Sequence, residues 1–114
     1  MDLSDGAERE LARTPDGRRL SFVIEWKDPP VLGPRMPLES RSERREALLA
    51  AMNAIKQPLL STLAGFPFVE VLDLAGTGQA VVKAPAERWR TLVESPSLKA
   101  AGVRILPNEE FYSD

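Results

Sequence analysis

Residues 78–114, GQAVVKAPAERWRTLVESPSLKAAGVRILPNEEFYSD, carry the clearest fold signals of this 114-residue chain. A glycine turn precedes a strand at 79–84, and Pro85 at a first helical position begins a short helix. Four apolar residues of this helix share one face: Ala86, Trp89, Leu92 and Val93. The break at Ser95-Pro96 and a last strand at 103–106 follow, so this segment predicts strand, helix and strand before an acidic and aromatic end.

Two further strands are predicted upstream of this segment. Residues 19–27, RLSFVIEWK, alternate so that Phe22, Ile24 and Trp26 share one face, while Ser21, Val23 and Glu25 share the other. Residues 68–74, FVEVLDL, form the second strand, and the glycines of 75–78 join it to the strand at 79–84 by a turn.

A long helix is predicted between these strands. Ser40 and Glu43 match a capping box, in which each side chain accepts from the other residue's free backbone N–H. Pro58 lacks an N–H and predicts a kink or a break near Lys56, and Ala64-Gly65 marks the end. The apolar stripe of this helix consists of Leu48, Met52, Ile55, Leu59 and Leu63.

Two polar segments flank these elements. Residues 28–39 hold four prolines and Gly33, which predicts a loop or an extended linker. Residues 1–18 contain the turn signal Pro15-Asp16-Gly17, and we expect them to form a flexible N-terminal arm with room for a short helix at 7–13. The expected division is therefore this arm and a single domain at 19–114, which ends in a tail at 107–114.

The element order is β-α-β-β-α-β, which is the pattern of the ferredoxin-like α+β fold. We therefore expect a four-stranded antiparallel sheet with both helices on one face. Adjacent apolar pairs such as Val81 and Val82 put apolar side chains on both faces of the sheet. Either the face without helices binds a partner or a second copy, or the pairs only reflect the β-propensity of valine and leucine.

Composition excludes several classes of function. The formal net charge is −2 and the isoelectric point is about 5.3, which disfavours a nucleic-acid-binding protein. The chain has no histidine and no cysteine, which removes imidazole bases, thiol nucleophiles, zinc sites and disulfides. A carboxylate-based enzyme or an oxygen-ligand metal site stays open, but the sequence has no Asp-rich loop and no Gly-rich phosphate cradle. We therefore expect no enzyme, no cofactor and no metal. With an acidic start and no long apolar run, we expect a cytoplasmic protein without a membrane segment.

The second half of the chain resembles the propeptides of subtilisin-like serine proteases and their stand-alone, inhibitory relatives. The resemblance covers residues 74–114 and rests on four features: Gly78 before a small and apolar strand, the helix start APAE at 84–87, Leu92, and Ser95-Pro96 before the last strand and its acidic tail. The chain departs from the family pattern at Gln79, Ala84 and Pro107, and residues 19–66 match by element order alone.

The resemblance implies an inhibitor or folding assistant whose open sheet face packs on two surface helices of a protease. Glu109 and Glu110 would then cap the N-termini of those helices, where carboxylates are favoured. Phe111 or Tyr112 would enter an apolar subsite, and Ser113 and Asp114 would approach the catalytic centre as an added strand.

Other interpretations of the same residues stay open. Residues 109–114 are also consistent with a frayed terminus. A ferredoxin-like regulatory module that dimerises or binds a small ligand through its sheet is the alternative function. An RNA-binding sheet is disfavoured, because the predicted strands lack the aromatic and basic residues that such a sheet uses to bind RNA. Trp26 and Trp89 are expected in the core.

Overall fold

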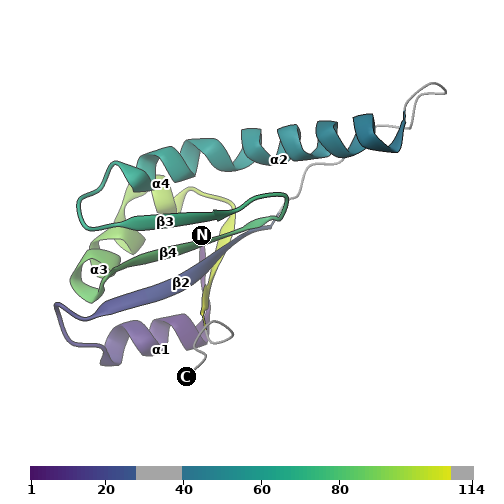
Figure 1. Cartoon of the computed structure of the whole chain (residues 1–114). Helices are drawn as coiled ribbons and strands as arrows, with labels where there is room; N and C mark the ends of the chain where they lie inside the picture. Colours follow the sequence, from purple (N-terminus) through teal and green to yellow (C-terminus); the bar gives the residue numbers. More distant parts are fainter. Residues whose placement is uncertain (28–39, 109–114) are drawn as a thin grey trace.

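The computed structural model describes residues 1–27 and 40–108, and the predicted linker at 28–39 lies outside this description. Within the described residues one five-stranded sheet carries four helices (Figure 1). The strands are β1 (Asp2–Leu3), β2 (Arg19–Trp26), β3 (Glu70–Leu74), β4 (Gln79–Pro85) and β5 (Val103–Pro107). The helices are α1 (Asp5–Arg13), α2 (Arg41–Ala64), α3 (Ala86–Glu94) and α4 (Pro96–Lys99).

The predicted α+β class is confirmed, but the prediction of a four-stranded antiparallel, ferredoxin-like sheet is wrong. The strand order is β1-β5-β2-β4-β3, and the sheet is mixed. β2 pairs antiparallel with β4 and β5, and β3 pairs antiparallel with β4. β1 is the additional strand, and it pairs in parallel with β5, with Leu3 opposite Ile105. It was missed because a two-residue strand has no detectable alternation.

Residues 1–18 are folded onto the sheet, which corrects the expectation of a flexible arm. The Ser4 hydroxyl accepts from the Ala7 backbone N–H and so caps α1. Ala7 and Leu11 lie one helical turn apart and are both buried in the core. An ion pair between Asp2 and Lys27 also holds β1 and lowers the pKa of the Asp2 carboxyl. The N-terminal strand β1 and helix α1 therefore pack against β5.

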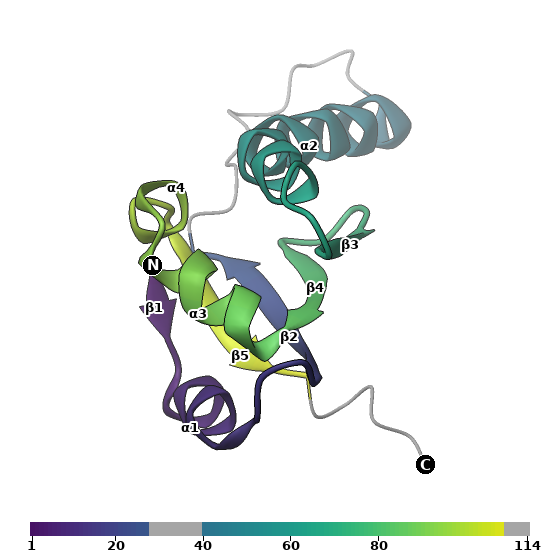
Figure 2. The same cartoon turned by 90° about the vertical axis from the view of Figure 1, so that its left-hand side faces the viewer.

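The core lies between the sheet and the helices. Phe22 and Ile24 are fully buried on one face of β2, as their two-residue spacing predicts. The Trp89 ring of α3 packs edge-on against Phe22, with ring centroids 4.8 Å apart, and its Nε1 donates to the Leu20 carbonyl at 3.0 Å. Figure 2 shows α1, α3 and α4 on this side of the sheet. The predicted core positions of β2 and α3 are confirmed, whereas Trp26 is only half-buried.

A kink or a break was predicted near Lys56, and of the two the break does not occur, because α2 is a single helix with Pro58 inside it. Pro58 and Ala54 are both exposed, so the Ala54 carbonyl that lacks its helical partner remains accessible to water. The predicted apolar stripe is buried only at Leu59 and Leu63, while Leu48 stays 41% exposed. Figure 1 shows the reason, because the first half of α2 extends past the end of the sheet.

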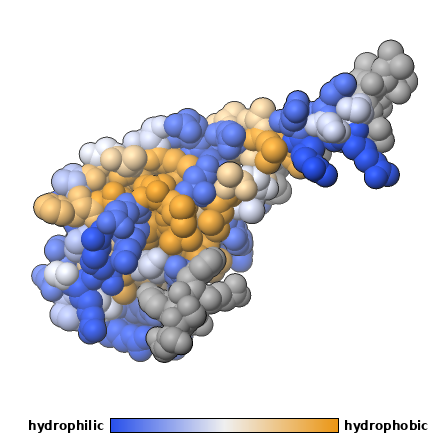
Figure 3. Space-filling view, viewed as in Figure 1, coloured by the Kyte–Doolittle hydropathy of each residue, from blue (hydrophilic) through white to orange (hydrophobic). Residues whose placement is uncertain are grey.

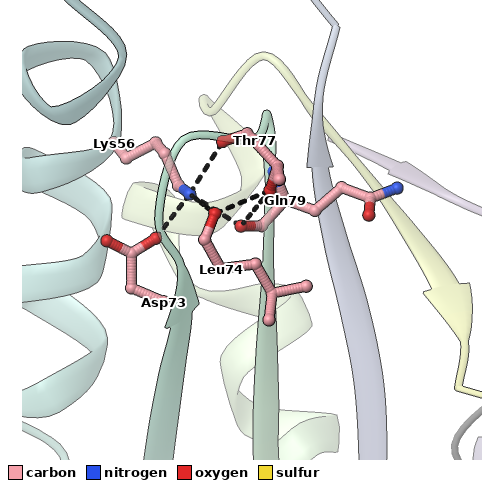
Figure 4. A network of polar contacts seen from close by, with 5 residues as sticks. All are labelled: Lys56, Asp73, Leu74, Thr77 and Gln79. Atoms are coloured by element: carbon pink, nitrogen blue, oxygen red, sulfur yellow. Dashed lines mark hydrogen bonds and ion pairs between the residues drawn. The ribbon is translucent and has the colours of Figure 1, made fainter. Parts of the chain in front are cut away.

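Lys56 joins α2 to the turn between β3 and β4 (Figure 4). Its side chain is only 1% exposed, and its Nζ donates to the carbonyls of Thr77 and Gln79 at 2.9 and 2.7 Å. It also pairs with the Asp73 carboxylate. A charged group is costly to bury unless it is paired and hydrogen-bonded, and these acceptors meet that requirement. This single ammonium group therefore fixes the turn against the helix.

No helix in the described ranges has the length and apolar character needed to cross a membrane.

Candidate protein-binding surface

An apolar row crosses the face of the sheet that the helices leave open. The pairing register sets Leu106 of β5 opposite Val23 of β2, Val23 opposite Val81 of β4, and Val81 opposite Leu72 of β3. Residues directly opposite in antiparallel strands point to the same side of a sheet, so the four side chains form one continuous row. We call Leu106, Val23, Val81 and Leu72 the open-face row.

From Val23 to β3, the exposure of the open-face row rises. Val23 is 8% exposed, and Leu72, on the last strand of the sheet, is 61% exposed. Figure 3, which views this side of the sheet, shows hydrophobic side chains gathered across its middle and continuing towards α2. A leucine this exposed at the end of a continuous apolar row is typical of a surface that a partner covers, and not of a core residue.

Polar residues border the open-face row on both sides. On one side, the Arg19 guanidinium reaches over β4 to the Glu70 carboxylate at 3.0 Å, and Lys83 lies opposite Glu70. On the other side, Gln79 donates to the Glu25 carboxylate at 3.0 Å. An apolar centre with a charged and polar rim is the usual composition of a protein interface.

A shallow hollow of about 240 Å³ lies at the exposed end of the row. Leu72 and Val81 contribute its apolar wall, and Ser21, Glu70 and Lys83 contribute polar groups. Its size suits one or two partner side chains, which is less than the volume that usually encloses a small-molecule ligand.

Phe68 lies just before β3 and adds a second exposed apolar group. Its ring is 68% exposed, with the Arg88 guanidinium 5.3 Å from the ring centre. Its backbone φ of +66° is in the left-handed region, which is strained for a side chain of this size. This backbone also explains why the strand begins at Glu70 and not at 68 as predicted. Strain of this kind is commonest at functional sites.

The six residues predicted to contact a partner, Glu109, Glu110, Phe111, Tyr112, Ser113 and Asp114, lie outside the described residues. The chain is described as far as Asn108, which is 5% exposed and donates from Nδ2 to the Ser21 Oγ on the open face at 2.9 Å. The predicted tail therefore starts beside the open-face row.

The sequence indicated part of this surface and missed part of it. The alternation of β2 placed Val23 on the open face, and the pair Val81 and Val82 indicated apolar groups on both faces. The row itself was not predictable, because its four members come into line only through the strand register. Phe68 was assigned to a strand, and its left-handed backbone had no signal in the sequence.

The two carboxyls with a lowered pKa lie away from the open-face row. A hydrogen bond with Lys27 lowers the pKa of the Asp2 carboxyl, and a hydrogen bond from the Gly17 backbone N–H lowers the pKa of the Glu87 carboxyl. Neither residue belongs to the open-face row. Within residues 1–27 and 40–108, no group of three or more acidic side chains is arranged to hold a metal ion. The open face therefore offers a partner an apolar area to bury, with charged residues at its rim.

Comparison of the chain with protein-family models, with curated proteins and with solved structures gives no match in any of the three.

Proposed function

We propose that the protein is a non-enzymatic binding module that docks through its open sheet face on a subtilisin-like serine protease, as an inhibitor or a folding assistant. The observation that carries this proposal is the open-face row, which ends in a leucine 61% exposed to solvent. The choice of partner rests on the sequence resemblance of residues 74–114.

The energetics of the surface support docking of a protein. Burying apolar area contributes about 25 cal/mol per Å², and covering Leu72 removes a large and exposed side chain from water. Most of the binding energy of an interface comes from a few such anchors. The Arg19–Glu70 pair at the rim orients a partner more than it adds affinity.

The tail has a defined role in this proposal. Glu109 and Glu110 cap the N-termini of two protease helices, where unpaired N–H groups and the helix dipole favour carboxylates. Phe111 or Tyr112 fills an apolar subsite, and Ser113 and Asp114 reach the catalytic centre. Since Asn108 is held to Ser21 on the open face, docking of that face brings the tail to the protease surface.

Inhibition assays against a panel of subtilisin-like proteases test the proposal. We expect the full chain to inhibit at least one of them. Leu72→Glu should weaken inhibition at least about tenfold, because it buries an unpaired charge in the interface. Leu48→Glu is the matched control, since Leu48 is also exposed but lies on α2 away from the row.

Deletion of 109–114 tests the tail separately, and inhibition should fall at least about tenfold through loss of the strand-like contacts. A chain that inhibits no protease in the panel would overturn the proposed partner. Equal inhibition by the deletion variant would overturn the role of the tail while leaving the docking face in place.

A second copy of the chain is the alternative occupant of this face. β3 is an edge strand, and the exposed Leu72 at its centre would meet its own counterpart if two β3 strands paired antiparallel. Light scattering separates the two cases. A stable dimer that Leu72→Glu dissociates, together with no protease inhibition, would establish the dimerisation module in place of the inhibitor.

A further inference from the structure

The first half of α2 has an apolar surface that the described part of the chain does not bury. Eight of the nine residues at 47–55, ALLAAMNAI, are apolar. None of the nine is buried, and Leu48 and Ile55 are 41% and 37% exposed. A helix that is apolar all round normally lies inside a protein. This half projects past the end of the sheet (Figure 1), so residues 1–27 and 40–108 leave most of it uncovered.

One row of this surface continues along α2 with the repeat of a helix–helix contact. Leu49 and Met52 lie against the turn between β3 and β4 and are not part of it. The row advances by three, four, three and four residues, which is the spacing by which two helices pack side by side. Ala51 is half-buried and the other members are exposed. We call this row the α2 seam, and its members are Leu48, Ala51, Ile55, Pro58 and Thr62.

The α2 seam ends in a hollow of about 260 Å³ between α2 and α4. Pro58 and Thr62 of the seam belong to its wall, and none of the described lining residues carries a charge. A hollow of this kind accepts an apolar side chain of a second helix, as a knob enters a hole. The lining residues are Pro58, Leu59, Thr62, Ser97, Ala100 and Ala101.

The surface around the α2 seam is almost without charge. From Ala47 to Val69 the one charged residue is Lys56, whose ammonium group is buried and paired with Asp73. The other charged residues of α2 all lie at 41–46. Contact between identical surfaces about a two-fold axis brings residues near the axis against their own counterparts, so a charge there would meet a like charge. An uncharged centre avoids this repulsion and favours a second copy as the partner.

We propose that the α2 seam binds the seam of a second copy of this chain, with the two helices antiparallel about a two-fold axis at the level of Asn53. This register sets Leu48 opposite Pro58, and it sets Ile55 opposite Ala51. A large side chain then faces a smaller one in each layer of the contact. Leu48 of each copy also reaches the hollow beside Pro58 of the other.

The ends of this contact are compatible in charge. Residues 41–46 of one copy lie beside 60–65 of the other, which contain no charged residue. A parallel pair would instead set 41–46 against the same residues of the second copy, with arginines against arginines. The contact covers about five helical turns, which is a small interface, so we expect a dissociation constant on the order of micromolar.

This inference goes beyond the proposed function and does not rest on it. α4 and the hollow lie on the helix side of the sheet, and the open-face row lies on the other side (Figure 2). Pairing through α2 therefore does not use the open face of either copy.

Light scattering of the full chain over a range of concentrations measures the pairing. We expect the apparent mass to rise from 12.6 kDa towards twice that value as the concentration increases to about 100 μM. Ile55→Glu should raise the dissociation constant at least about tenfold, because it puts a charge into each half of an apolar contact. Asn53→Glu is the matched control, since Asn53 is exposed on the opposite side of the same helix and its change should leave the constant unaltered.

Engineered cysteines provide a second measurement, because the chain contains no cysteine of its own. Ile55→Cys should form a disulfide between two copies at least about tenfold faster than Asn53→Cys under the same mild oxidation, since pairing holds residue 55 of both copies close to the axis.

A mass that stays at 12.6 kDa throughout, or equal disulfide rates for the two cysteine variants, would overturn the inference. A dimer that Leu72→Glu dissociates and Ile55→Glu does not would place the contact at the open face, and it would overturn the inference as well. No protease takes part in these measurements, so their failure is distinguishable from failure of the proposed function.

Discussion

The two faces of the sheet are built from adjacent residues of the same strands, yet they have different physical roles. Val82 of β4 is fully buried under the helices, and its neighbour Val81 is only partly covered on the open face. On β2, Ile24 is fully buried in the core while Val23 belongs to the open-face row. Apolar character is thus similar on both faces, but among residues 1–27 and 40–108 only one face has a layer of helices over it.

The comparison shows why apolar composition alone does not define a core. On the helix side, Trp89 and Phe22 interlock and the Trp89 N–H has an acceptor, so that each group is satisfied within the chain. On the open side, Leu72 contributes little to the stability of the chain alone because it is exposed to water. Its burial by a bound partner would stabilise the complex. Substitutions on the helix side should therefore change stability, and substitutions on the open side should change association.

Two lysines give the largest expected contrast. Lys56→Met removes the buried ammonium group, which takes away the donor to the Thr77 carbonyl and the ion-pair partner of Asp73, so we expect a loss of about 3 kcal/mol in the free energy of unfolding. Lys83→Met on the open face should change it by less than about 0.5 kcal/mol, because Lys83 is exposed. Urea denaturation measures both. Equal losses would mean that the contacts of Lys56 add no net stability.

The adjacent valines of β4 give a contrast of intermediate size. Val82→Ala removes two buried methyl groups and leaves a cavity, which should cost roughly 2 kcal/mol in the free energy of unfolding. Val81→Ala, the same change one residue earlier, should cost less than about 1 kcal/mol, since Val81 is not fully covered. If Val81→Ala lowered the free energy of unfolding of the chain alone as much as Val82→Ala does, the proposed difference between the two faces would be wrong.

The sequence predicted local elements better than it predicted their arrangement. The spacing of Phe22 and Ile24 and the proline before α3 were sufficient to place those elements, because such patterns depend on near neighbours. The parallel pairing of β1 with β5 depends on residues about a hundred positions apart, such as Leu3 and Ile105, and no local pattern encodes it. The same limit applies to the open-face row, which arises from the strand register.

The smallest expected effect is on acid unfolding, and it concerns Glu87 of α3, on the helix side of the sheet. The Gly17 backbone N–H donates to the Glu87 carboxylate at 2.7 Å, and this bond lowers the pKa of Glu87 below its ordinary value of 4.5. A carboxyl whose pKa is lower in the folded state contributes stability that is complete above that ordinary value and is lost as the pH falls through the folded-state pKa.

Glu87→Gln should therefore lower the melting temperature at pH 7, and the difference from the unaltered chain should shrink towards pH 2.5. Thermal unfolding across this range measures it, with Glu46→Gln on the projecting part of α2 as the control that should show no difference at either pH. If the difference in melting temperature between Glu87→Gln and the unaltered chain stayed constant with pH, the Gly17 contact would not depend on the charge of the carboxylate.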